Sequence, residues 1–450
     1  MQRLGRQALR SFSTAAAVEQ VDVVVVGGGL VGNALAAAVG KQPELEGASV
    51  LVLEAGGEPK RKHEGQNGYS NRVSSIAPSS KSFLHSLKVW EALPRVNAVQ
   101  RLEVWDACSG SRIGYANKSP EKPISWIVEN EAIIAALLEQ CQASPNVRHR
   151  YNASIDRIRI PYSLEEKAEV FLSDGSVYQA KLLVGADGAR SSVRRALGQR
   201  YFSWDYGQKG LVATLHIQHE GPANNIAWQR FSPNGPIALL PLGKGLSSLV
   251  WSTSAKEASE LLSLSDGEFI QRLNEALLTD GMQNRLANAA LFQGHMLRNF
   301  FQPGAHEGAP ERVPVVTGLE PGSRAAFPLG VGHSSRYIAS RTCLIGDAAH
   351  RIHPLGGMGV NLGFADAQSL AHHLHTAASN GADLGDPLYL EDYERGRMLA
   401  NLPVMGVCDG LNRLFSTSFT PLVTARAIGL AAVNALPKLK QLIIAQASQA

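Results

Sequence analysis

The sequence predicts an α/β fold in which a parallel-sheet domain is assembled from separate segments of the chain and an antiparallel-sheet domain lies between them. Three observations support this prediction. A run of valines at residues 21–26 precedes a GxGxxG pattern and an alanine-rich helical stretch. A second apolar run ends at Glu54. Residues from about 201 to 335 alternate apolar and polar side chains, as antiparallel strands do.

The chain has 450 residues, which is enough for two packed domains. Its net charge of +4 arises mostly from Arg3, Arg6 and Arg10, without which 40 basic and 39 acidic residues remain. We therefore expect no nucleic-acid partner. The four cysteines have neither CxxC nor metal-ligand spacing, so a disulfide framework or a metal site is not expected.

The first residues are typical of a mitochondrial transit peptide. They combine arginines at helical spacing with leucine, alanine and serine, and contain no acidic residue before Glu19. The stretch RSFS predicts a cut after Phe12, so residues 1–12, extending to about 20, are excluded from the fold. A disordered basic tail is the alternative.

The GxGxxG pattern predicts a dinucleotide site at the start of the folded part. Gly27 permits a tight turn, Gly29 lets a pyrophosphate approach the backbone, and Gly32 lets the helix lie close to the sheet. The helix N-terminus then offers unpaired N–H groups to the phosphates. Glu54 ends the next strand at the spacing expected for an acid that contacts the adenosine ribose.

Two later motifs follow buried strands. The first, LLVGADGARSSVRRALG, places Asp187 and Gly188 after a strand and before a probable helix. The second, CLIGDAAHRIHPLGGMGVNLGFADA, contains Asp347 and then a proline and glycine-rich loop. In their order along the chain, these motifs and GxGxxG resemble those of the FAD-dependent aromatic hydroxylases related to para-hydroxybenzoate hydroxylase.

That resemblance implies FAD as the cofactor and assigns roles to the second motif. Asp347 is expected to accept hydrogen bonds from the ribityl chain, and Pro354 to border the face of the flavin that reacts with oxygen. The helix that begins near Gly357 is expected to direct its N–H groups at the flavin pyrimidine ring. The remaining expected FAD-binding residues are Glu54, Arg72, Asp187, Gly188, Gly356, Gly359 and Asn361. Pro354 and Gly357 are expected to form the catalytic loop at the flavin ring, with no side-chain acid or base assigned.

Three side chains keep open alternatives. Arg72 is expected to reach FAD, with a solvated loop arginine as the alternative. Asn130 is interpreted as either a helix N-cap or a contact near the flavin. Arg230 is interpreted as lining the substrate cavity or pairing on the surface. His350 and His353 are interpreted as loop-packing or hydrogen-bonding residues rather than metal ligands.

Five longer stretches resemble the ubiquinone-biosynthesis hydroxylases. One is the second motif, and the other four are NRVSSIAPSS, WIVEN, WQRFSPNGPIALLPL and SRAAFPLG. With the transit peptide, this implies a mitochondrial enzyme that hydroxylates ring carbon 5 of a polyprenylated 4-hydroxybenzoate through a flavin hydroperoxide. Met358 departs from the pattern, since these enzymes usually carry glutamine there. Another FAD-dependent hydroxylase, a prenyl reductase or a non-catalytic scaffold of the biosynthetic complex remain alternatives.

The same resemblance implies partners and a location. Besides the phenolic substrate and dioxygen, we expect ferredoxin with ferredoxin reductase, or NADPH, as the electron source, and other ubiquinone-biosynthesis proteins in a complex. The C-terminal residues are apolar but interrupted by charges and a proline, which favours peripheral contact with the matrix side of the inner membrane over spanning it. Core-packing helices are the alternative.

The expected domains follow from the motifs. The FAD domain comprises residues 21–200, interleaved with a substrate-domain segment at about 81–124, and residues 336–400. The substrate-binding sheet covers residues 201–335, and helices follow at 401–450. Within the sheet region, the proline- and glycine-rich residues 301–324 are expected to form a long surface loop.

Overall fold

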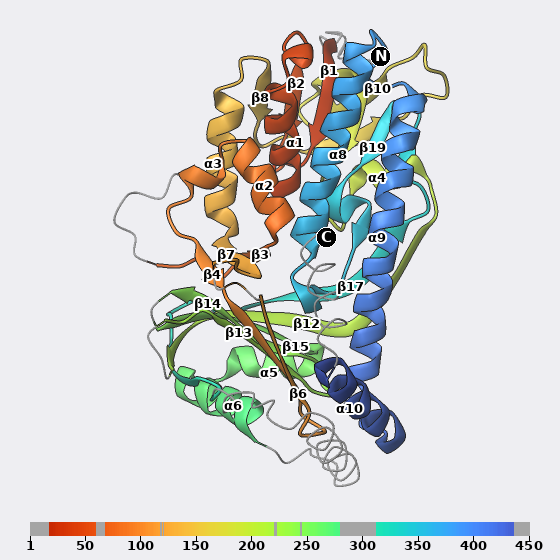
Figure 1. Cartoon of the computed structure of the whole chain (residues 1–450). Helices are drawn as coiled ribbons and strands as arrows, with labels where there is room; N and C mark the ends of the chain where they lie inside the picture. The colour runs from red at the N-terminus through yellow and green to blue at the C-terminus, as the bar shows by residue number, and fades with distance from the viewer. Residues whose placement is uncertain are drawn as a thin grey trace, which may run out of the picture.

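The computed structural model describes residues 18–59, 68–117, 119, 121–219, 223–243, 245–279 and 312–435. The expected transit peptide at residues 1–12 lies outside these residues. The described chain forms two lobes, one built on a mainly parallel sheet and one on a mainly antiparallel sheet (Figure 1). This confirms the predicted fold class.

The first sheet has the strand order β18-β19-β11-β1-β2-β8, and β10 and β9 extend it by antiparallel pairing. The strands β19, β11, β1, β2 and β8 run parallel. Residues 23–25 are completely buried, as expected for a strand covered on both faces. The strands are β1 Val18–Val26, β2 Val50–Leu53, β8 Val147–Arg150, β9 Ile155–Arg159, β10 Ala168–Leu172, β11 Val177–Gly185, β18 Ile338–Ala339 and β19 Thr342–Leu344.

Helices cover this sheet, and α1 lies beside α8 (Figure 1). A Cβ atom at Gly363 of α8 would come within 2.5 Å of Val31, so a glycine permits this close helix contact. The helices of this lobe are α1 Leu30–Gly40, α2 Pro78–Ser86, α3 Asn130–Gln142, α4 Ser192–Leu197, α8 Gly359–Ser379 and α9 Pro387–Phe415. Short 3-10 helices are η1 Pro43–Leu45, η2 Trp90–Ala92, η3 Gly346–Ala348 and η4 Pro354–Gly356.

The second sheet has the order β20-β17-β12-β15-β14-β13-β5-β6, with β16 paired to β12. Its pairs are antiparallel except for β13 and β5, which run parallel. The strands are β5 Arg101–Asp106, β6 Arg112–Ala116, β12 Tyr201–Gln218, β13 Ile226–Phe231, β14 Ile237–Gly243, β15 Leu246–Ser254, β16 Val315–Leu319, β17 Ala325–Ser334 and β20 His350–Arg351. Apolar side chains of α5 Ala255–Ser263 and α6 Asp266–Leu278 pack against this sheet.

Two features differ from the expected boundaries. Part of the stretch expected to be a loop is strand β16, because residues 315–319 pair with β12; residues 301–311 lie outside the described chain. The boundary expected at residue 401 falls inside α9, which continues through Pro403.

The remaining elements join the lobes. A three-stranded sheet of β3 Val73–Ile76, β7 Ser125–Glu129 and β4 Asn97–Val99 lies beside α2 and α3, next to the second lobe (Figure 1). Helix α10, Thr420–Ala435, lies near β6 at the lower end of α9. In the described part of the chain, we find no helix with the length and apolar character to cross a membrane.

Candidate FAD-binding site

The glycine-rich turn after β1 has the steric properties expected for a phosphate-binding turn. Gly27 has φ +108°, and a Cβ atom there would lie 2.4 Å from the Ala186 carbonyl oxygen. A Cβ atom at Gly32 would lie 2.0 Å from the carbonyl oxygen of Gly27, whereas one at Gly29 would meet no described atom within 4 Å. Gly29 precedes α1, whose N-terminus has no side-chain cap. The turn therefore packs tightly against the protein at Gly27 and Gly32, whereas the space beside Gly29 is free for a pyrophosphate.

Glu54, directly after β2, bridges backbone groups beside this turn. Oε2 accepts a hydrogen bond from the Gly28 N–H at 2.7 Å, and Oε1 accepts one from the Gly56 N–H at 2.7 Å. Each carboxylate oxygen keeps further acceptor capacity. The contact expected between Glu54 and the ribose remains a prediction.

Asp187 organises the start of α4. Its Oδ2 accepts hydrogen bonds from the N–H and the hydroxyl of Ser192, at 2.6 and 2.9 Å. The neighbouring Gly188 has φ +75°, and a Cβ atom there would meet nothing within 4 Å. Asp187 thus fixes the local backbone through Oδ2, while its Oδ1 has no partner among the described residues. The expected contacts of Asp187 and Gly188 with FAD stay predictions.

Arg194 connects this motif with the third one. From α4, its guanidinium donates to the Ala348 carbonyl oxygen at 2.8 Å and to the Ala189 carbonyl oxygen at 2.6 Å. It also stacks over the Tyr201 ring, with 3.9 Å between the guanidinium carbon and the ring centroid. The sequence places Arg194 on a helix but does not reveal that it joins two motifs more than 150 residues apart.

Asp347 presents an unpartnered carboxylate at the third motif. Its side chain is exposed, and no described residue forms a hydrogen bond with it. Desolvation by the surrounding protein raises the pKa of this carboxyl, while His350, Arg351 and Arg194 oppose the rise. Exposure and desolvation are compatible for a side chain that lines a concave site open to water. An acceptor in this position suits the hydroxyl groups of a ribityl chain.

The loop after Asp347 closes onto the three-stranded sheet. Pro354 and Gly356 lie in η4, and Gly357 follows with φ +63°. A Cβ atom at Gly357 would lie 3.3 Å from the Ser75 Cβ, whereas Gly359 has no such close neighbour. Only a residue that accepts a left-handed conformation fits at Gly357 without strain.

Asn361 holds this loop in place. Its Oδ1 accepts a hydrogen bond from the Ala77 N–H at 2.9 Å, and its Nδ2 donates to the Ser75 and Gly357 carbonyl oxygens at 2.8 and 3.2 Å. The amide group is therefore used within the protein, so we interpret Asn361 as a residue that positions the flavin loop. Its expected direct contact with FAD stays a prediction.

The N-terminus of α8 follows the loop. Met358 stands at its N-cap position, without a side-chain cap. The Met358 side chain packs against a cluster that includes Leu362 and Met405. The first N–H groups of α8 are thus left for a ligand. These backbone donors are present although methionine stands at position 358 in place of the usual glutamine.

The residues with open alternatives have different surroundings. Arg72 is exposed, and its guanidinium forms no hydrogen bond or ion pair with the described residues. Asn130 is the first residue of α3 and accepts a hydrogen bond from the Ser74 hydroxyl at 2.7 Å, while Glu129 holds the N-cap position. Arg230 is buried and donates to the carbonyl oxygens of Ala276 and Thr279 at the end of α6. This contradicts the surface alternative for Arg230, and a place beside the substrate stays a prediction.

Of the two histidines near the loop, one forms a polar contact and the other packs against an aromatic ring. His350 lies 2.5 Å from Asp366, and His353 packs edge-on against Tyr206 with 5.2 Å between the ring centroids. Among the described residues, no cluster of three or more histidine, cysteine or acidic side chains has an arrangement suited to a metal ion.

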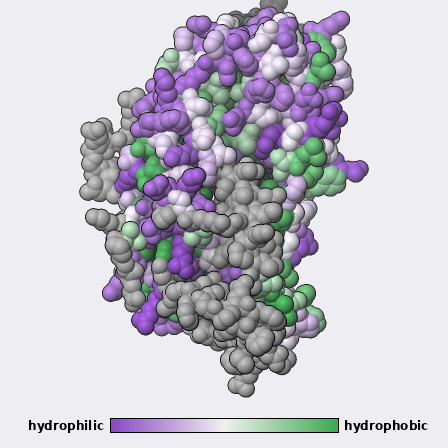
Figure 2. All heavy atoms as spheres, in the orientation of Figure 1, coloured by the Kyte–Doolittle hydropathy of each residue, from purple (hydrophilic) through white to green (hydrophobic). Residues whose placement is uncertain are grey.

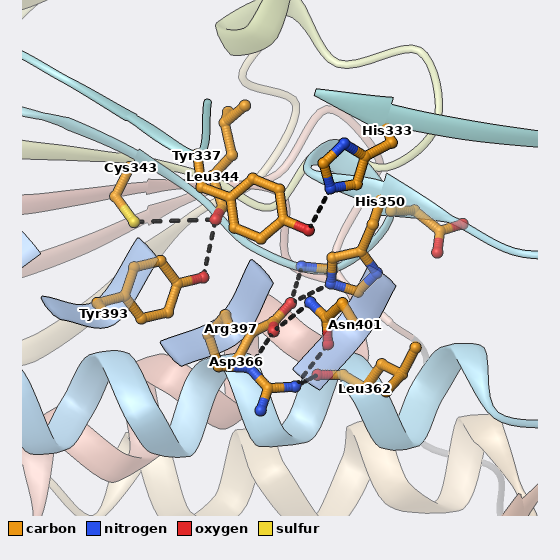
Figure 3. Close-up of polar contacts among 12 residues, drawn as sticks. His333, Tyr337, Cys343, Leu344, His350, Leu362, Asp366, Tyr393, Arg397 and Asn401 are labelled. Carbon is orange, nitrogen blue, oxygen red and sulfur yellow. Dashed lines mark hydrogen bonds and ion pairs between the residues drawn. The ribbon is translucent and has the colours of Figure 1, made fainter. Parts of the chain in front are cut away.

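A buried cluster behind the site was not assigned from the sequence. Asp366 contacts the turn that precedes Asp347, and Arg397 and Asn401 of α9 contact Asp366 (Figure 3). The sequence offers one sign of this cluster, since Asp366 is an acidic residue on the otherwise apolar face of α8. Its partners on α9 lie 31 and 35 residues away, beyond the range of helical periodicity.

Comparisons with known proteins agree with this geometry. The family model described as "FAD binding domain" matches residues 20–298 and 312–401. The chain is also 44% identical over 437 residues to "Ubiquinone biosynthesis monooxygenase COQ6, mitochondrial" of Xenopus tropicalis, covering 95% of this chain and 93% of that protein. The chain belongs to the COQ6 family. The human COQ6 protein is 44% identical over 452 residues, covering 98% of this chain and 95% of its own length.

Solved structures outside the COQ6 family share the fold. p-Nitrophenol 4-monooxygenase PnpA of Pseudomonas putida DLL-E4 superposes with a TM-score of 0.68 at 19% identity, covering 96% of this chain and 99% of that chain. PqsL of Pseudomonas aeruginosa, described as a probable FAD-dependent monooxygenase, superposes with a TM-score of 0.65 at 23% identity, covering 91% and 100%.

The cofactor of this COQ6 family member is FAD. The matched domain supports this assignment, and the described residues fit the group. The open turn at Gly29 suits the pyrophosphate, the unpartnered Asp347 suits the ribityl chain, and the uncapped start of α8 suits the flavin ring.

Proposed function

We propose that this chain is the FAD-dependent monooxygenase that hydroxylates ring carbon 5 of a polyprenylated 4-hydroxybenzoate in ubiquinone biosynthesis. The observation that carries the proposal is the nearly full-length similarity to COQ6 in a chain whose FAD-binding motifs keep their required geometry. The name of those relatives supplies the pathway and the oxygen chemistry. The transit-like N-terminus supports a mitochondrial location.

Bound FAD supplies the redox and oxygen-activating chemistry of such a reaction. The chain has to orient the phenol ring and keep water away from it. Two contacts join the flavin side to the substrate sheet. Gln229 of β13 donates to the Leu355 carbonyl oxygen at 3.2 Å, and Asn71 donates to the Ser323 carbonyl oxygen at 2.8 Å. The first bond fixes the flavin loop relative to strand β13, and the second fixes the segment before β3 relative to the segment before β17.

The test is complementation in cells that lack their ring hydroxylase, with identification of the quinone precursor. We expect the wild-type chain to restore ubiquinone and to remove the precursor that lacks the carbon-5 hydroxyl. The Asp347→Ala variant should fail to do so, while Asp392→Asn, an exposed acid on α9, should succeed. Ubiquinone synthesis that continues with Asp347→Ala would favour a scaffold, and a product reduced in its prenyl chain would favour a reductase.

The electron source is proposed to be ferredoxin with ferredoxin reductase. In the described chain, the GxGxxG turn after β1 is the single such turn at the end of a parallel strand, and it is assigned to FAD. The purified protein should therefore be reduced rapidly by reduced ferredoxin and slowly by NADPH alone. Rapid reduction by NADPH without ferredoxin would contradict this.

The chain is further proposed to lie on the matrix face of the inner membrane, in a complex with other ubiquinone-biosynthesis proteins. Helices α9 and α10 and the segment between them carry exposed apolar side chains, which we call the apolar surface: Leu399, Leu402, Val407, Phe419, Leu422 and Ile428. Figure 2 shows hydrophobic residues along the edge of the molecule where these helices lie. A lipid-linked substrate makes a membrane surface the most suitable partner for such helices.

The charges near the apolar surface are neutralised within the protein. Asp409 pairs with Arg413 at 2.8 Å, and Arg426 is buried against Asp106. These pairs reduce the net charge that the two helices present to a bilayer.

Membrane contact is tested by fractionation and vesicle binding. Alkaline carbonate or high salt should release the wild-type protein from the membrane. If both treatments leave it there and only detergent releases it, peripheral association is contradicted. The double variant Leu399→Glu, Phe419→Glu should bind phosphatidylcholine–phosphatidylglycerol vesicles about tenfold more weakly, because charges resist burial in the interface. The control is Leu388→Glu, at the far end of α9, which is also exposed.

A further inference from the structure

Asp366 lies at the centre of a buried polar cluster behind the flavin-binding turn (Figure 3). Its Oδ2 accepts a hydrogen bond from the Gly346 N–H at 2.9 Å and lies 2.5 Å from Nε2 of His350. This oxygen therefore contacts the residue directly before Asp347 and a residue three positions after it, on either side of the turn formed by η3.

The other carboxylate oxygen of Asp366 faces α9. Oδ1 accepts a hydrogen bond from Nε of Arg397 at 2.7 Å and one from Nδ2 of Asn401 at 3.3 Å. Arg397 in turn donates to Oδ1 of Asn401 at 2.8 Å, so the two α9 side chains orient each other. Asp366 thus ties the turn to a helix that is distant in sequence.

The cluster is arranged for a charged carboxylate. Burial disfavours the ionised form of Asp366, but His350 and Arg397 together bring the pKa of this carboxyl below its ordinary value. An ionised group accepts stronger hydrogen bonds than a neutral one. Both oxygens act only as acceptors here. A neutral asparagine amide in the same place would therefore point its NH2 group at one of the N–H donors that now bind the carboxylate.

The turn has a conformation that needs such support. Gly346 adopts φ +59°, and its N–H is the group that Asp366 binds. The next residue is Asp347, whose carboxylate has no partner among the described residues. A change in the orientation of the peptide group at Gly346 would therefore move the side chain that is expected to bind the ribityl chain.

Helix α9 also fixes the strands that lead into this turn. The Tyr393 hydroxyl donates to the Leu344 carbonyl oxygen at 2.9 Å, and Glu394 accepts from the Tyr337 N–H at 2.6 Å. The same side of α9 thus contacts the segment before the turn as well as Asp366.

We propose that Asp366 is a positioning residue for FAD, which sets the geometry of the Gly346–Ala348 turn and so of Asp347, and that Arg397 and Asn401 of α9 hold Asp366 in its working orientation. The proposal rests on the FAD-dependent function above. It concerns cofactor affinity, which is measured without substrate, so a wrong assignment of the substrate would leave its test unaffected.

The first test is the FAD dissociation constant of Asp366→Asn, measured by flavin fluorescence on apoprotein that is folded at the temperature used. We expect binding to weaken at least tenfold, because hydrogen bonds to a charged acceptor are lost. The visible circular dichroism of the bound flavin should change as well, which a general loss of stability would not cause. Asp392→Asn serves as the control. An affinity within twofold of wild type would overturn the proposal.

A milder variant keeps the test valid if Asp366→Asn does not fold. Asn401→Ala removes the 3.3 Å hydrogen bond and frees Arg397, and we expect FAD to bind about three- to tenfold more weakly. Unchanged FAD affinity in Asn401→Ala would overturn the proposal.

A double-mutant cycle then identifies the route of the effect. If Asn401 acts through the turn that carries Asp347, Asn401→Ala should have little further effect on FAD affinity in an Asp347→Ala background. Additive losses of affinity in the double variant would show that the α9 residues act elsewhere and would overturn the proposal.

Discussion

An added side chain at Gly32 would collide with the backbone, whereas one at Gly29 would point into free space. Gly32→Ala places its Cβ against a backbone oxygen, so we expect the apoprotein to lose about 1–3 kcal/mol of stability. Gly29→Ala meets no protein atom, so the apoprotein should keep its melting temperature while FAD affinity falls about tenfold. Thermal unfolding and FAD titration of both variants check this pair. Wild-type FAD affinity in Gly29→Ala would contradict the placement of the pyrophosphate.

The buried imidazole of His353 predicts a pH dependence. Neither ring nitrogen has a partner among the described residues, and burial lowers the pKa of His353 to about 4. The unfolded chain binds a proton at its ordinary pKa of about 6.5, so the stability contributed by the neutral ring is present above that pH. It is lost as the pH falls toward 4, by up to about 3 kcal/mol.

Denaturant unfolding at several pH values measures this effect. The free energy of unfolding should fall less steeply between pH 6.5 and pH 4 in His353→Phe than in the wild type, because the aromatic replacement cannot take up a proton. Equal slopes in this window would show that His353 does not contribute.

At the residue scale, the sequence predicts the steric demands on glycines better than it predicts the hydrogen-bond partners of polar side chains. The demands on Gly27 and Gly32 are steric and local, so spacing alone identifies them. Asn361, in contrast, bonds to the Ser75 carbonyl oxygen across 286 residues. No local pattern reveals such a partner, and the same holds for the contact between Asp366 and α9.

At the element scale, a buried ion pair adds to the apolar contacts that attach α10. Arg426 donates to Asp106 at 2.9 and 3.0 Å, and also to the Leu414 and Thr417 carbonyl oxygens. Arg426→Met would leave the Asp106 carboxylate buried without its cation, and we expect a loss of about 3–5 kcal/mol. Denaturant unfolding measures the loss, and limited proteolysis should show cleavage near α10.

The matched control for this prediction is Arg395→Met on α9. Arg395 is exposed and lies 3.8 Å from Asp392, and exposed pairs of this kind contribute less than about 1 kcal/mol. If Arg426→Met were no less stable than Arg395→Met, the attachment of α10 would depend on its apolar contacts instead.

Element types were predictable where periodicity is strong, and element ends were not. The alternating pattern within residues 201–335 corresponds to strands β12 to β15, whose buried faces pack against α5 and α6. Strand β16 lies in a proline- and glycine-rich stretch, where pairing with β12 outweighs local preference. Helix α9 continues through Pro403 because its packing on both lobes supports it on either side.

At the scale of the whole molecule, FAD should stabilise the fold. The site draws on turns that follow β1, β11 and β19, so a bound ligand holds distant parts of the chain together. Removal of FAD should lower the melting temperature, and added FAD should raise it in a concentration-dependent way, with about 2.7 kcal/mol gained at a hundredfold excess over the dissociation constant. Thermal scans measure this. Asp347→Ala should show a smaller shift at equal FAD concentration, and no shift in the wild type would contradict the site.

The late position of α9 in the chain has a consequence for biogenesis. The glycine turn after β1 leaves the ribosome early, but Arg397 and Asn401, which complete the support behind Asp347, emerge only near the end of synthesis. A nascent or prematurely terminated polypeptide that stops before these residues carries every flavin motif and still lacks their anchor. Under the role proposed for Asp366, stable capture of the cofactor requires that α9 has already been synthesised.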